Sequence, residues 1–181
     1  ANLLANALVN STQLKILALS NIDDITTAGW QALFGSSLQS PRCMLEELRL
    51  CDNDFGDDDV TYLSNSLVNN CVLRRLDLSE NNEVTASGWR AFAAVLQNPN
   101  TALEKIDLRV NSINNDVLVS FAKSLTHNNK LKDLFLDYDE ESVFDTPSDW
   151  DSLSNVLCNK SSINATFNSN HTLQRIFDPD D

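Results

Sequence analysis

The sequence is poor in glycine, proline and basic residues. Four Gly and four Pro in 181 residues exclude collagen-like chains and proline-rich linkers. Thirteen Lys and Arg stand against 26 Asp and Glu, which gives a net charge of −13. Since nucleic acids and anionic membranes are bound mainly through cations, this balance argues against both as partners. The chain also lacks an apolar run of about 18 residues, so no membrane insertion is expected.

Motifs for catalysis and metal binding are missing as well. The sequence contains no C-x-x-C, H-E-x-x-H, G-x-G-x-x-G, P-loop or G-x-S-x-G pattern. Its two histidines, His127 and His171, lie in expected loops, where a histidine is usually solvated. The acidic run 52–59 has the composition of a calcium loop, but Leu63 stands where an EF-hand requires Glu. We therefore expect a protein that is not an enzyme and binds no cofactor or metal.

Five copies of the template L-x-x-L-x-L recur along the chain. Their first residues are Leu14, Leu45, Leu73, Leu103 and Leu131, at steps of 31, 28, 30 and 28 residues. The ninth position is asparagine in three copies (Asn53, Asn81 and Asn111), where we expect the amide to bond backbone groups at the bend after a strand. Between the copies, apolar residues recur at three- and four-residue steps, which predicts a helix after each strand.

This pattern resembles the leucine-rich-repeat family, over nearly the whole chain from Leu4 to about Leu157. The long period and the alternation of two repeat types are typical of the ribonuclease-inhibitor-like subclass. The resemblance implies an α/β solenoid of about five to six repeats, an uncapped fragment with a parallel sheet on the concave side and helices on the convex side. Since one repeat cannot bury its apolar face alone, stacked repeats are expected to share one core.

The alternation is visible where the helices are expected to begin. The first, third and fifth repeats carry Trp30, Trp89 and Trp150 there, each after Thr or Ser residues that favour a helix start. The second and fourth repeats carry acidic residues instead, which suit the positive end of the helix dipole. Because the tryptophans share one position at the start of an inward-facing helix, we interpret them as core anchors and not as a binding stripe.

We predict a single leucine-rich-repeat domain over residues 1–181. Its expected divisions are a partial repeat at 1–13, repeats at 14–44, 45–72, 73–102, 103–130 and 131–162, and an irregular C-terminal segment at 163–181. The first residues match the helix of an earlier repeat without a polar cap, so we expect a piece of a larger chain or assembly. The tail after Leu157 is similar to the end segments of microalgal leucine-rich-repeat proteins, and a further strand is expected near Leu173.

The four cysteines do not form a disulfide framework. Cys43 and Cys71 occupy the same place in adjacent repeats, and strands about 4.8 Å apart make a bridge between them sterically conceivable. Free thiols in a reducing compartment are the expected state, which favours a cytoplasmic, intracellular location. Four N-x-S/T sequons do not indicate secretion, because Asn, Ser and Thr are abundant enough for this number to arise by chance.

Function is expected on the concave surface of the strands. The second template position, occupied by Lys15, Glu46, Arg74, Glu104 and Lys132, alternates in sign and predicts a self-satisfied ladder of ion pairs. The remaining positions are mixed in polarity, as in protein-binding surfaces. The expected partner-binding residues are Arg49, Asp77, Asp107, Arg109, Phe135, Asp137 and Tyr138.

Two hypotheses for Phe135 and Tyr138 have equal weight. Exposed beside Arg109, the two aromatic side chains would have the composition of an interface hot spot. Alternatively, the acidic loop 139–145 or the tail after Ile163 folds over both side chains and hides them. The structure must decide between an exposed anchor and a covered core residue.

These observations favour a non-catalytic scaffold that binds a partner protein through its concave strand surface. The alternative is a GTPase-activating protein of the leucine-rich-repeat type, which rests on an analogy of fold alone. A single-turnover GTP hydrolysis assay with small GTPases would separate the two.

Overall fold

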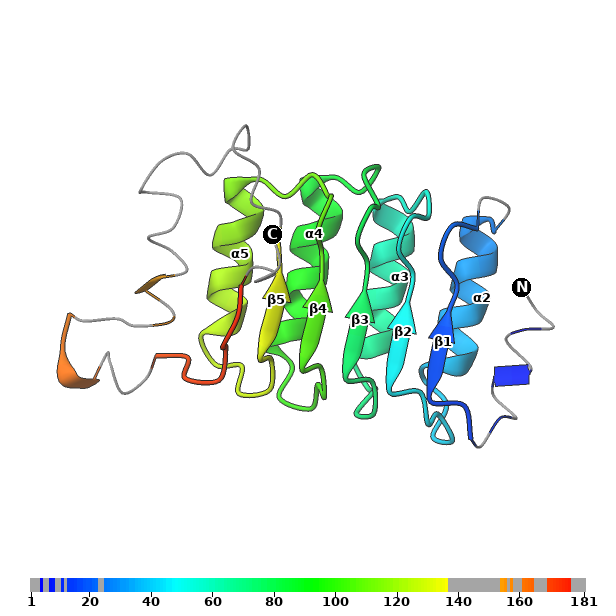
Figure 1. Ribbon diagram of the computed structural model, residues 1–181, viewed down its shortest axis with the longest axis horizontal. Helices are drawn as coiled ribbons and strands as arrows, with labels where there is room; N and C mark the ends of the chain where they lie inside the picture. Colours follow the sequence, from blue (N-terminus) through cyan, green and yellow to red (C-terminus); the bar gives the residue numbers. More distant parts are fainter. Residues whose placement is uncertain are drawn as a thin grey trace.

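The computed structural model of the chain describes residues 4, 7, 8, 11, 13–22, 25–136, 154, 155, 157, 161–164 and 169–176. Short strands and longer helices alternate along this part of the chain (Figure 1). The strands are β1 (Ile16–Ala18), β2 (Glu47–Arg49), β3 (Arg75–Asp77), β4 (Lys105–Asp107) and β5 (Asp133–Phe135). The helices are α2 (Thr27–Ser37), α3 (Asp57–Leu67), α4 (Ala86–Ala93) and α5 (Asn115–Leu125), and the 3-10 helix η1 (Ala94–Gln97) continues α4.

The five strands form one parallel sheet in chain order, β1-β2-β3-β4-β5. The register matches equivalent template positions: Leu48 pairs with Leu17 on one side and with Leu76 on the other. The helices form a second layer behind the sheet, also in chain order (Figure 1). The expected α/β arrangement with a parallel sheet is confirmed, and it is compatible with a leucine-rich-repeat-like fold.

The core lies between the two layers and consists of the template leucines and the inward helix residues. Leu48, Leu76 and Leu134 are almost fully buried, whereas Leu17 at the β1 edge is half-buried. From the helices, apolar residues at three- and four-residue steps are buried in the same core: Val60, Leu63, Leu67, Val117, Phe121 and Leu125. Stacking repeats therefore bury a continuous core, as the spacing predicts.

The tryptophans of the first and third repeats are core residues. Trp30 is 3% exposed and Trp89 is fully buried. The ring of Trp30 packs edge-on against Phe55 of the next repeat, with 4.8 Å between ring centroids. The interpretation of the tryptophans as core anchors is thus confirmed for these two, while Trp150 lies outside the described residues.

The helix starts follow the residues that the sequence places there. The side chains of Thr26, Thr85 and Asn114 each accept a hydrogen bond from a backbone N–H of the first turn of α2, α4 and α5. At α3 the helix begins after Gly56, and the Asp59 carboxylate accepts a bond from the Gly56 amide at 3.0 Å. Each cap satisfies donors that a helix N-terminus leaves without partners.

The ninth-position asparagines form a structural ladder. The Asn81 amide is fully buried and donates to the carbonyl oxygens of Leu50, Leu78 and Ser79 at 3.0–3.1 Å. Asn53 and Asn111 make equivalent bonds, each to two carbonyls of its own repeat and to one of the preceding repeat, Leu19 and Leu78 respectively. The expected backbone-bonding role of these asparagines is confirmed.

A second set of asparagines, which the sequence analysis missed, lies three residues before the strand segments. Asn70, Asn128 and Asn170 each donate to a carbonyl of the preceding repeat, at 2.8–2.9 Å. Their side-chain oxygens accept from the first amides of the following strand segment. Asn170 is a sequon asparagine, but it is 5% exposed and its amide is engaged, so it serves packing.

The segment 173–176 continues the sheet beyond β5. Arg175 and Asp133 form a parallel bridge, and the amide of Leu134 donates to the Arg175 carbonyl at 2.9 Å. The expected strand near Leu173 is therefore present as a short pairing. Cys43, Cys51 and Cys71 are free, and Cys158 lies outside the described residues.

Candidate interaction surface on the sheet

The face of the sheet turned away from the helices, here called the strand face, gathers most of the basic side chains. It consists of template positions two, three, five and seven of each repeat. Eight of the 13 Lys and Arg residues but only six of the 26 Asp and Glu residues lie in the described strand segments. The cations are Lys15, Arg49, Arg74, Arg75, Lys105, Arg109, Lys132 and Arg175. At these four positions the described cations exceed the carboxylates by two, but position eight of the same surface adds Asp52 and Glu80, so the described surface carries no net excess of charge in a chain of net charge −13.

Position two forms the expected ladder of ion pairs. Lys15 contacts Glu46 at 2.8 Å, and Glu104 lies between Arg74 and Lys132, with Lys132 Nζ at 2.6 Å. The hydrogen bonds from Lys132 and Arg74 lower the pKa of Glu104, and the bond from Lys15 lowers the pKa of Glu46. This column satisfies itself, so it offers little for recognition.

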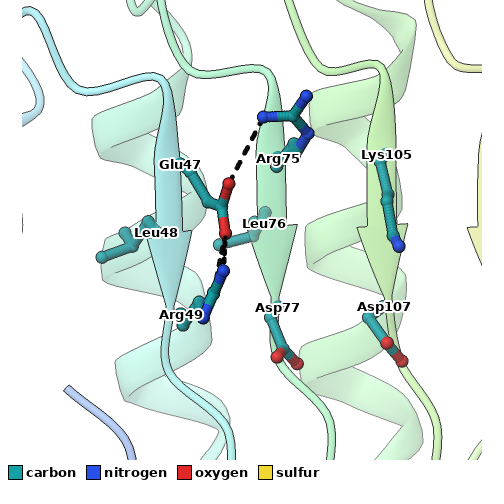
Figure 2. A pocket seen from close by; sticks show the side chains of 8 residues that line it. All are labelled: Glu47, Leu48, Arg49, Arg75, Leu76, Asp77, Lys105 and Asp107. Atoms are coloured by element: carbon teal, nitrogen blue, oxygen red, sulfur yellow. Dashed lines mark hydrogen bonds and ion pairs between the residues drawn. The ribbon is translucent and has the colours of Figure 1, made fainter. Parts of the chain in front are cut away.

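A hollow of about 320 Å³ lies on the strand face across β2, β3 and β4 (Figure 2). Its lining consists of Glu47, Leu48, Arg49, Arg75, Leu76, Asp77, Lys105 and Asp107. Positions three and five therefore carry its charged groups. A concave site with convergent polar groups is the usual form of a binding site.

Glu47 organises one side of the hollow. Its carboxylate accepts from Arg49 Nε at 2.6 Å and contacts Arg75 Nη1 at 3.3 Å (Figure 2). The side chains of Arg49 and Arg75 stay 52% and 58% exposed, whereas Glu47 is 12% exposed. One carboxylate thus positions two guanidinium groups that solvent, or a partner, can reach.

The carboxylates at position five are less accessible than the sequence analysis expects. Asp107 is 7% exposed, and Arg109 binds both of its oxygens, at 3.0 and 2.7 Å. Asp77 is half-buried and accepts two bonds from Ser79, at 3.0 and 2.7 Å. A partner therefore meets Arg109 before it meets Asp107.

Phe135 is not an exposed anchor. It is 2% exposed, which corrects the hypothesis of an aromatic hot spot at this position. Three cations surround its ring: Lys105 Nζ is 4.4 Å from the centroid, and the guanidinium carbons of Arg109 and Arg175 are 5.7 and 5.6 Å away. Arg175 comes from the C-terminal segment and is held by two bonds of 2.7 Å to Asp133, so the tail contributes to the cover, as the second hypothesis states.

The structure thus brings four of the expected partner-binding residues to one area, with Phe135 beneath it. Arg49, Asp77 and Asp107 line the hollow, and Arg109 covers Asp107. Asp137 and Tyr138 lie outside the described residues. Glu47, Arg75 and Lys105 also line the hollow but were not predicted as site residues; the signal for them is the third template position, which they share.

Two further features are absent from the described part of the chain. No three His, Cys, Asp or Glu side chains among these residues lie close enough together to hold a metal ion. Within the same residues, no helix has the length and apolarity required to cross a membrane.

Known proteins that resemble the chain include leucine-rich-repeat-containing proteins. No protein-family model matches it. "NACHT, LRR and PYD domains-containing protein 14" of Homo sapiens is 29% identical over 133 residues, and "NACHT, LRR and PYD domains-containing protein 5" of Mus musculus is 29% identical over 136 residues. Each match covers 74% of this chain, which spans only 12% and 11% of the two relatives.

Two solved structures share the fold. "Leiomodin-1 Actin-Binding Site 2 (ABS2)" superimposes with a TM-score of 0.68 at 17% identity, covering 83% of each chain. The tropomodulin C-terminal domain of Caenorhabditis elegans has a TM-score of 0.64 at 16% identity, over 83% of this chain and 89% of that one. None of the four names designates an enzyme. Together with the repeat spacing, these similarities indicate a leucine-rich-repeat-like chain.

Proposed function

We propose that this chain is a non-catalytic scaffold that binds a partner protein through the concave strand surface of a leucine-rich-repeat solenoid. The observation that carries the proposal is the concentration of eight of the 13 Lys and Arg residues on the strand face of a strongly acidic chain. Exposed ion pairs contribute little to folding. Complementary charges on a surface mainly give a partner its specificity and its rate of association.

The comparisons support a protein as the partner. Leucine-rich-repeat proteins are among the relatives, and one structure of the same fold is described as an actin-binding site. These likenesses concern the class of partner and not its identity. The period of 28–31 residues and the alternation of two repeat types further support the ribonuclease-inhibitor-like subclass.

The proposed contact residues differ in role. Arg49, Arg75 and Lys105 present cations around the hollow, and Asp77 presents a carboxylate beside them. Phe135 supports Lys105 from below, and the guanidinium groups of Arg109 and Arg175 pack against the same ring.

Affinity capture with matched variants tests the proposal. The strand-face variant replaces Arg49, Arg75 and Lys105 by Ala, and the control replaces the exposed Arg90, Lys123 and Lys130 by Ala, so both lose three cations. Circular dichroism and thermal unfolding confirm that both variants remain folded. We expect at least one captured protein to be lost with the strand-face variant and retained by the control.

The same protein, once purified, should bind the strand-face variant about tenfold more weakly than wild type, a loss of about 1.4 kcal/mol. The proposal fails if every captured protein is retained by the strand-face variant, or if only the control variant loses binding.

A further inference from the structure

The hollow on the strand face contains like-charged neighbours that the ladder at position two avoids. In the register of β3 and β4, Arg75 lies opposite Lys105, and Asp77 lies opposite Asp107. Like charges directly opposite each other on neighbouring strands are destabilising. Between β3 and β4, two cations therefore lie side by side, with two carboxylates two residues further along, whereas opposite charges face each other between β2 and β3 and between β4 and β5.

The described residues compensate this pattern only in part. Arg75 reaches Glu47, and Asp107 is held by Arg109. Lys105, in contrast, forms no ion pair with any described residue and lies over the ring of Phe135. Asp77 likewise contacts no cation in the described part of the chain and accepts only from Ser79. Asp133 lies opposite Lys105 in the register and Arg49 lies opposite Asp77, but neither Lys105 nor Asp77 forms an ion pair with a described residue. These two groups lie diagonally across β3 and β4, and both line the hollow (Figure 2).

We propose that the hollow binds an extended segment of the partner protein that carries one acidic and one basic side chain, separated by a single residue. The acidic side chain pairs with Arg75 and Lys105, and the basic side chain pairs with Asp77. This inference rests on the proposed function and specifies the chemistry of its partner.

The spacing of the charges favours this occupant. Positions three and five are two residues apart on the same strand, about 6.6 Å, and side chains at i and i+2 of an extended segment have the same separation. The volume of about 320 Å³ admits side chains, not a folded element. A simple anion such as phosphate is disfavoured, because the carboxylates of Asp77 and Asp107 lie beside the two cations.

Selection from a displayed library of short random peptides tests the inference on the whole chain. Wild-type protein should enrich peptides with Asp or Glu and Lys or Arg separated by one residue, in either order. A synthetic peptide of this kind should bind the double variant Arg75→Glu/Lys105→Glu at least about tenfold more weakly. The control variant Arg90→Glu/Lys123→Glu, whose substitutions lie on α4 and α5, should bind this peptide with the affinity of the wild-type protein.

Peptides selected on variants with reversed charges in the hollow should differ in sequence from those selected on the wild-type protein. Selection on Arg75→Glu/Lys105→Glu should lose the acidic residue, and selection on Asp77→Lys should lose the basic one. Peptides that bind the strand face but are uniformly acidic or uncharged would overturn the inference and leave the proposed function intact. Failure to enrich any peptide would also overturn it, while the capture experiment decides the proposed function separately. Peptides that lose binding to the Arg90→Glu/Lys123→Glu control but not to Arg75→Glu/Lys105→Glu would contradict both the inference and the proposed function.

Discussion

The carboxylate of Asp57, the first residue of α3, caps the next helix through Thr85, which lies 28 residues further along the chain. Thr85 donates its backbone N–H to Asp57 Oδ1 at 2.8 Å and its hydroxyl to Oδ2 at 2.6 Å. Thr85 in turn accepts from the Ser87 amide as the N-cap of α4. The second and third repeats are therefore connected at their helix starts, in addition to their shared core.

This contact makes Gly88 intolerant of a larger residue. A Cβ added at Gly88 would lie 2.6 Å from Asp57 Oδ1 and 2.8 Å from Val84 Cγ1. Although Ala is the better helix former by about 1 kcal/mol, overpacking costs about 1–3 kcal/mol, so we expect Gly88→Ala to destabilise the protein. Urea unfolding measures the change.

Gly35 in α2 is the matched control, since a Cβ added there meets no atom within 4 Å. Gly35→Ala should stabilise the protein by about 0.5–1 kcal/mol. Equal effects of the two substitutions would show that the Asp57–Thr85 contact does not crowd Gly88.

Val110 adopts a backbone conformation that disfavours its side chain. Position eight has a positive φ in four repeats, 57° at Asn21, 54° at Asp52, 58° at Glu80 and 54° at Val110. Because a β-branched residue is strained in this region and Asn tolerates it, we expect Val110→Asn to raise the free energy of unfolding by about 1 kcal/mol. Val110→Thr keeps the branched side chain and should give no gain; a gain of the same size would attribute the effect to polarity instead.

Substitution of Phe135 should lower the stability of the fold. Since its ring is 2% exposed beneath three cations, Phe135→Ala should lower the free energy of unfolding by about 3 kcal/mol. Phe135→Leu, which keeps most of the apolar volume, should cost less. Thermal and urea unfolding measure both variants. If the Phe135→Ala variant has the stability of the wild-type protein, Phe135 is not a core residue, and the hypothesis of an exposed anchor is favoured.

The ladder at position two makes stability depend on pH. Hydrogen bonds from Lys132 and Arg74 lower the pKa of Glu104 below its ordinary value of 4.5, so the unfolded chain binds protons more readily than the folded one. The contribution of Glu104 is therefore present above about pH 4.5 and lost as the pH falls through the lowered pKa. Urea unfolding at several pH values should show a smaller acid loss for Glu104→Gln than for wild type, and Glu83→Gln, an exposed carboxylate outside the ladder, should behave as wild type.

The repeat spacing was sufficient to predict the elements, the core and the ladder, because each follows from residues at fixed template positions. Leu48 and Leu76, for example, are buried simply because position four faces the helices. The cover of Phe135 was predicted only as one of two alternatives, since it depends on Arg175, a residue 40 positions away in a tail of irregular spacing. The role of Asn70 was equally hidden, because its bonds cross to the preceding repeat.

The charges of the hollow required the register as well as the sequence. Arg75 and Lys105 are 30 residues apart, and only the alignment of β3 with β4 makes them neighbours. Single template columns, taken one at a time, do not reveal a diagonal pair such as Lys105 and Asp77.

The most direct test of the central claim is a map of the bound surface. Amide chemical shifts of the isotope-labelled protein, recorded by NMR during titration with the purified partner from the capture experiment, locate the contact without any substitution. We expect the largest changes at the ends and centres of β2, β3 and β4, around Arg49, Arg75 and Lys105, with the helices α2 to α5 little affected. Changes concentrated on the helices, with the strand face unaltered, would contradict the claim that this surface binds the partner.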